Sequence, residues 1–168
     1  MTKSPEPLGI DELPLSQEDI DSLKKIARAA DAKKAAQVCL FVGPSGTGKT
    51  LVAATLANEM KRPLQRAKLA ALRGRSPEET EKSLAAFFEK AQAAEAILFF
   101  DEADALFGKR TEVKDSHDRY ANQEVSYLLE ALAAYRGLVI LSSNRKAEAE
   151  APIAGRAAHV LTFARPDR

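Results

Sequence analysis

The chain has 168 residues, a usual length for one domain, and its hydrophobic (45%) and charged (29%) fractions are typical of a globular protein. The formal net charge of +1 gives no overall attraction to nucleic acid or anionic membranes. Cys39 is the only cysteine, which excludes an intrachain disulfide. No apolar run is long enough to span a bilayer and no secretory signal is evident, so a cytoplasmic location is expected by default.

The first half of the chain predicts a linker, two helices and two strands. Residues 1–15 contain prolines and a glycine and are predicted to be an extended linker. Ser16 is a predicted N-cap, and the helix after it has one apolar face, formed by Ile20, Leu23, Ile26, Ala27 and Ala30. The apolar run 38–42 is typical of a buried strand. A glycine-rich turn, a helix over 51–60 and a weaker strand over 64–69 follow.

The second half continues the alternation of helices and strands. Ser76 and Pro77 predict a helix start, and the helix has an apolar face formed by Leu84, Phe87, Phe88 and Ala91. Strands are predicted over 96–100, 138–141 and 160–163, with a charged loop over 107–118 and an amphipathic helix around 121–132. This order favours an α/β fold in which helices cover both faces of a parallel sheet. Ligands of such sheets bind at the carboxyl ends of the strands.

A phosphate-binding loop is predicted directly after the first core strand. Residues 43–50 fit the pattern G-x-x-x-x-G-K-[ST] between a strand and a helix. Glycines let successive N–H groups turn toward phosphate oxygens, and the helix start adds its positive end. The lysine is expected to reach the β- and γ-phosphates and the threonine to ligate Mg²⁺. The predicted nucleotide-binding residues are Gly43, Pro44, Ser45, Gly46, Thr47, Gly48, Lys49, Thr50 and Leu51.

Two acidic residues stand at the end of the strand predicted over 96–100. Asp101 is a predicted Mg²⁺ ligand beside Thr50, and Glu102 is the predicted general base that activates water. The alternative is that these acids only cap the next helix, a role that Asp104 also suits. The letters Asp-Glu-Ala-Asp invite comparison with DEAD-box helicases, which need two tandem domains and a longer chain.

The strand predicted over 138–141 leads to Ser142, Ser143 and Asn144 at the same sheet edge. Asn144 is a candidate to orient the attacking water or to contact the γ-phosphate. An ordinary turn asparagine explains the residue type equally well.

These three blocks, in this order, resemble the AAA+ ATPase family, over about residues 10–167. Residues 43–50 look like its Walker A motif, residues 97–104 look like its Walker B motif, and Asn144 matches the sensor-1 position. Residues 79–82, 106–110 and 115–122 are further matches, close to bacterial members of the AAA clade. The resemblance implies a three-layer P-loop NTPase fold, with a five-stranded parallel sheet of order 5-1-4-3-2.

The resemblance also implies assembly into a ring, usually a hexamer, in which a neighbour completes each site. Arg156 aligns with the arginine finger that stabilises charge on the γ-phosphate, and is thereby a fourth predicted catalytic residue beside Lys49, Glu102 and Asn144. A second arginine that many members carry is His159 here. The loop before Glu79 has no aromatic residue to grip a threaded polypeptide, and the family's helical lid does not follow the last strand.

Three functions remain in competition. The first is ATP hydrolysis with Mg²⁺ that remodels an unidentified protein partner. The second is a nucleotide-gated binding module with negligible turnover, favoured by the missing pore aromatic, the missing lid and His159. The third, a small-molecule kinase, lacks any evident acceptor segment. ATP is favoured over GTP because nothing resembles the Asn-Lys-x-Asp guanine motif. No feature indicates a membrane or nucleic-acid partner.

Overall fold

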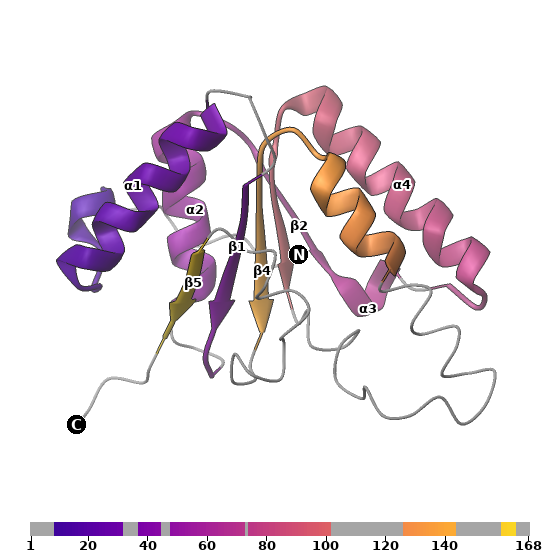
Figure 1. Cartoon of the computed structure of the whole chain (residues 1–168), viewed down its shortest axis with the longest axis horizontal. Coiled ribbons are helices and arrows are strands. Elements are labelled where there is room, and N and C mark those ends of the chain that lie inside the picture. The colour runs from indigo at the N-terminus through magenta and orange to yellow at the C-terminus, as the bar shows by residue number, and fades with distance from the viewer. Residues whose placement is uncertain are drawn as a thin grey trace.

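A computed structural model describes residues 9–31, 37–44, 48–72, 74–101, 126–143 and 159–163. Its centre is a five-stranded sheet of order β2-β3-β4-β1-β5, in which every neighbouring pair is parallel (Figure 1). This order is the predicted 5-1-4-3-2 counted from the other edge. The strands are β1 (Gln37–Val42), β2 (Leu64–Lys68), β3 (Ile97–Asp101), β4 (Leu138–Ser143) and β5 (His159–Thr162).

Helices cover both faces of the sheet, which confirms the three-layer prediction (Figure 1). One face packs against α1 (Gln17–Asp31) and α2 (Lys49–Met60), and the other against α4 (Pro77–Ala94) and a helical segment over 126–134. Strand side chains alternate between these two cores, so that Phe41 and Phe99 lie under α1 and α2, whereas Leu40 and Phe100 lie under α4. Among the helices that the structure describes, none has the length and apolarity to cross a membrane.

The start of α1 follows the predicted capping pattern. The Ser16 hydroxyl accepts a hydrogen bond from the N–H of Asp19 at 3.1 Å, and Ile20, Leu23 and Ile26 are buried as predicted. The segment before it differs from the predicted linker. Residues 9–15 include a short 3₁₀ helix, η1 (Ile10–Glu12), whose Ile10 is buried in the core under α1 and α2 together with Leu13. Burial of these two side chains removes apolar surface from water and holds the segment against α1 and α2.

Several element boundaries differ from those predicted by one or two residues. The strand predicted over 64–69 ends at Lys68, because Leu69 begins a short helix, α3 (Leu69–Leu72). The strand predicted over 138–141 continues to Ser143, since β1 beside it supplies hydrogen-bonding partners as far as Val42. Ser76 caps α4 as predicted by accepting a hydrogen bond from the N–H of Glu79 at 3.2 Å. The loop predicted over 107–118 lies outside the described residues.

Tyr135 lies at the amino ends of the strands, away from the phosphate loop, and is the basis of a prediction about stability. Its buried hydroxyl donates to the carbonyl oxygen of Ala96, and burial raises the pKa of Tyr135 to about 12. In the unfolded chain the pKa of a tyrosine is about 10, so the folded protein binds the phenol proton more tightly. This difference adds to the free energy of unfolding below pH 10, and the contribution is lost as the pH rises toward 12. We expect Tyr135→Phe to unfold more easily at neutral pH, by about 1 kcal/mol, and to lose less stability between pH 10 and 12. Urea unfolding of both proteins across this pH range checks the expectation, and parallel pH profiles would contradict it.

Candidate functional site

Gly43 directly follows β1, where the backbones of three neighbouring strands meet. Its N–H donates to the carbonyl oxygen of Ser143 at 3.0 Å, and the N–H of Phe163 donates to that of Val42 at 2.7 Å. Gly43 has a φ of +154°, and a Cβ at this position would lie 2.4 Å from the carbonyl oxygen of Phe163. Only glycine fits here, because the neighbouring backbone cannot withdraw without breaking the sheet.

Gly48 lies at the other end of the phosphate loop, as the N-cap of α2. Its φ of +95° is in the left-handed region that favours glycine. Glycine has no side chain to cap the first N–H groups of α2, so these donors can receive a phosphate oxygen at the positive end of the helix. The observed strand before Gly43 and the observed helix after Gly48 are the context that the motif requires.

Lys49 is the first residue of α2 and is buried, with 6% of its surface exposed. Its ammonium group donates to the carbonyl oxygen of Gly43, and to that of Ser143 at 3.1 Å. These contacts hold a positive charge between the ends of β1 and β4, at the base of the loop. A buried ammonium at this position is well suited to bind an anionic phosphate, because an anion compensates a buried positive charge.

Asp101 and Thr50, the two predicted magnesium ligands, are both on the face of the sheet that α1 and α2 cover. Ile97 and Phe99 of β3 belong to the core under α1 and α2, so alternation places Asp101, at the end of β3, on the same face of the sheet. Thr50 is in the first turn of α2, which covers that face (Figure 1). Mg²⁺ usually takes one or two protein oxygens in addition to phosphate oxygens and water. Within the described ranges no group of three or more His, Cys, Asp or Glu residues is placed to hold a metal without a phosphate.

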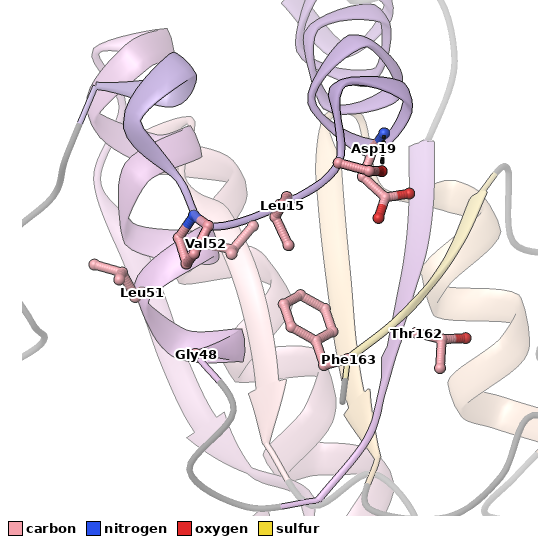
Figure 2. Close-up of a pocket in the computed structure, with 9 residues that line it drawn as sticks. Leu15, Asp19, Gly48, Leu51, Val52, Thr162 and Phe163 are labelled. Atoms are coloured by element: carbon pink, nitrogen blue, oxygen red, sulfur yellow. Dashed lines mark hydrogen bonds between the residues drawn. The ribbon is translucent and has the colours of Figure 1, made fainter. Parts of the chain in front are cut away.

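A pocket of about 250 Å³ opens beside the phosphate loop, and its walls come from three parts of the chain. Figure 2 shows Leu15 on one side and Phe163 on the other, with Gly48 and Val52 of the loop and α2 nearby. The lining residues are Pro14, Leu15, Ser16, Asp19, Gly48, Leu51, Val52, Thr162 and Phe163. Sequence reasoning missed the contribution of Pro14 and Leu15, because the predicted linker included them, and it gave Ser16 only the role of a helix cap. The apolar Leu13 and Leu15 within that segment were the available signal.

The segment that forms this pocket is tied to α1 by charge. The ammonium group of Lys24 lies 2.7 Å from the carboxylate of Asp11 in η1, which joins η1 to the second turn of α1. Both side chains are exposed to solvent, so water screens their attraction and the pair mainly positions the segment.

Several predicted site residues lie outside the described residues. They are Ser45, Gly46, Thr47, Glu102, Asn144 and Arg156. The structure thus brings together Gly43, Gly48, Lys49, Thr50 and Asp101 at the carboxyl edge of the sheet. Cys39 is buried in β1, and burial raises the pKa of its thiol far above the usual range, so it is a core residue and no nucleophile.

The sequence profile of the ATPase family associated with various cellular activities (AAA) matches residues 39–165, well over half of the chain. The chain belongs to this AAA family. The cell division cycle protein 48 homolog of Archaeoglobus fulgidus is 34% identical over 125 residues, which cover 73% of this chain and 17% of that protein. The AAA family ATPase y4kL of Sinorhizobium fredii is 34% identical over 134 residues, which cover 76% of this chain and 39% of that protein.

The crystal structure of the FIGL-1 AAA domain in complex with ADP superposes on this AAA domain with a TM-score of 0.70. The identity is 22%, and the match covers 98% of this chain and 58% of that one, so the likeness confirms the fold. This AAA domain spans less than half the length of either relative named above. Family membership makes it a nucleotide-binding P-loop domain of the ATPase type.

The loop before α4 in this AAA domain is held by two side chains from the first turn of that helix. The N–H of Gly74 donates to the Thr80 hydroxyl at 2.9 Å, and the N–H of Arg75 donates to the Glu79 carboxylate at 2.7 Å. A Cβ on Gly74 would lie 2.3 Å from that of Glu79, so glycine is required here as well. Residues 79–82 carried part of the family resemblance, and the structure gives two of them a role in shaping the loop.

Proposed function

We propose that this AAA domain binds ATP with Mg²⁺ and hydrolyses the bond between its β- and γ-phosphates. The observation that carries the proposal is the buried ammonium of Lys49, which lies at the base of a phosphate loop and donates to the carbonyl oxygens of Gly43 and Ser143. In the nucleotide complex this charge exchanges the carbonyl oxygens for the β- and γ-phosphate oxygens. Thr50 and Asp101 hold the magnesium ion, which neutralises charge on the phosphates when bound.

Hydrolysis needs groups beyond those that bind. Glu102 directly follows Asp101, and we assign it as the general base that takes a proton from water as the water oxygen attacks the γ-phosphorus. The bond from the γ-phosphorus to the bridging oxygen breaks, leaving ADP and inorganic phosphate. Asn144 orients the water, and Arg156 of a neighbouring copy stabilises the negative charge on the γ-phosphate.

The pocket beside the loop is the proposed site of the adenine base. It shares Gly48 with the phosphate loop, and aliphatic Leu15 and aromatic Phe163 suit the two faces of a flat ring. A base in this pocket contacts three segments at once: the segment before α1, the first turn of α2 and the end of β5. Nucleotide binding is therefore expected to stabilise residues 14–16 against local unfolding, an effect that hydrogen exchange measures.

The wider role that we propose is remodelling of a protein partner by a homo-oligomeric ring. Support comes from the family, in which a neighbouring subunit supplies the arginine finger. The partner is not identified by any described contact. The loop of Gly74 and Arg75 presents a basic and not an aromatic side chain, so gripping of a threaded polypeptide by an aromatic ring is not part of the proposal.

ATP hydrolysis per subunit, measured as the protein concentration rises, tests this function. We expect specific activity to increase several-fold with concentration, because sites completed by a neighbour form only in the oligomer. Glu102→Gln is the control that keeps the binding residues and removes the base. Arg156→Ala should abolish the gain with concentration while leaving nucleotide binding in place.

Two results would contradict the proposal. If the protein binds no ATP, the assignment of residues 43–50 as a phosphate-binding loop is wrong. Binding without turnover at any concentration would instead identify a nucleotide-gated binding module, the second function considered above.

A further inference from the structure

Lys68 and Asp101 are neighbours across two strands at the carboxyl edge of the sheet. In the parallel pairing of β2 with β3, Lys68 is the registered partner of Asp101. Adjacent strands lie about 4.8 Å apart, so the two side chains start from backbone positions at that separation. The pairing places the last residue of the edge strand beside the predicted magnesium ligand.

The two side chains are also on the same face of the sheet. Leu64 of β2 packs against the core under α1 and α2, so alternation places Arg66 and Lys68 on that face. Asp101 follows Ile97 and Phe99 onto it in the same way. Lys68 is exposed and Asp101 is half-buried. The positive charge of the exposed Lys68 side chain is largely solvated, so its interaction with the Asp101 carboxylate is weak enough to be changed by a bound ion.

We propose that Lys68 sets the magnesium affinity of the site by competing, through its positive charge, with Mg²⁺ for the Asp101 carboxylate. This inference rests on the proposed function, in which Asp101 holds the ion. A cation at one strand spacing attracts the carboxylate and repels a divalent ion bound to it. Lys68 therefore weakens the gain in nucleotide affinity that Mg²⁺ provides, which favours release of the ion together with the product. Lys68 acts through Asp101 and is a positioning residue.

Arg66 provides a matched control on the same strand. It carries the same charge on the same face, but its registered partner is Phe99, so it lies two residues further from the carboxyl edge. Removing this charge should leave the magnesium site unchanged if proximity to Asp101 is what matters. Lys68→Arg is the conservative variant, because it keeps a positive charge at the same position.

The experiment measures ADP binding to the full chain, once with excess Mg²⁺ and once with a chelator. The ratio of the two dissociation constants reports the coupling between ion and nucleotide on the protein, since formation of Mg–ADP in solution is the same for every variant. We expect Lys68→Gln to raise this ratio about threefold and Lys68→Glu about tenfold, as for a partly solvated charge pair that is removed or reversed. Arg66→Gln and Lys68→Arg should match the original chain.

Salt supplies a second readout. The difference between Lys68→Gln and the original chain should shrink in high salt, because the competing charge is exposed to solvent. A purely structural effect of the substitution would not follow ionic strength in this way.

The results separate the inference from the function on which it rests. If the original chain binds ADP with Mg²⁺ coupling and Lys68→Gln leaves the ratio unchanged or lowers it, the inference is wrong and the proposed function stands. An equal rise for Arg66→Gln would also overturn it. If the original chain binds no ADP, or binds it without any effect of Mg²⁺, the proposed function itself fails.

Discussion

Replacing Gly43 with alanine should destabilise the fold by about 3 kcal/mol, as expected when backbone strain adds to a steric clash. The new methyl group would lie 2.4 Å from the carbonyl oxygen of Phe163 and 2.9 Å from its Cβ. Neither atom can move freely, because the N–H of Phe163 is hydrogen-bonded to β1 and the N–H of Gly43 to β4. Urea unfolding followed by circular dichroism measures the loss, and ADP affinity should fall with it.

Gly48→Ala is the matched control for this clash. Gly48 also has a positive φ, +95°, but among the described residues no atom lies within 4 Å of a Cβ at this position. Its substitution should therefore cost only the backbone strain, about 1 kcal/mol. Equal losses of stability in the two variants would show that strain, and not the contact with Phe163, makes glycine necessary at Gly43.

Replacing Lys49 with methionine should weaken ATP binding about 100-fold, as expected for loss of a charged hydrogen-bond donor to phosphate. Methionine keeps much of the buried aliphatic chain in α2 and removes only the ammonium group. The free protein should change by about 1 kcal/mol or less, because the Ser143 carbonyl oxygen retains its hydrogen bond from Gly43. Calorimetric titration with ATP and urea unfolding of the free protein separate the two effects.

Lys90→Met provides the comparison for charge alone, since Lys90 is exposed on α4, on the opposite face of the sheet. It should bind ATP like the original chain. If Lys49→Met binds ATP with unchanged affinity, or unfolds before binding can be measured, the assignment of Lys49 to the phosphates loses its support. A parallel titration of Lys49→Arg then distinguishes a need for charge from a need for the shape of lysine.

Much of this protein is determined by local features of its sequence. The apolar runs that become β1, β3 and β4 are continuous because both faces of these strands are covered. Ser16 and Ser76 begin α1 and α4 through hydrogen bonds between residues three apart. The phosphate loop is equally local, since a short run of residues specifies its glycines, its lysine and its helix start. Such features depend on near neighbours and can be predicted from them.

Only the tertiary structure decided the features that join distant segments. Residues 9–15 were predicted as part of a linker, whereas Ile10 and Leu13 are buried in the core that α1, α2 and the sheet build; their apolarity alone does not show which core they enter. The pocket beside the phosphate loop likewise needs β5, α2 and this segment together. Lys68 belongs beside Asp101 through strand register, and a shift of one residue would send its side chain to the other face. Strand register and packing depend on all the contacts of the fold together. The sequence alone therefore does not distinguish Lys68 from an ordinary surface lysine.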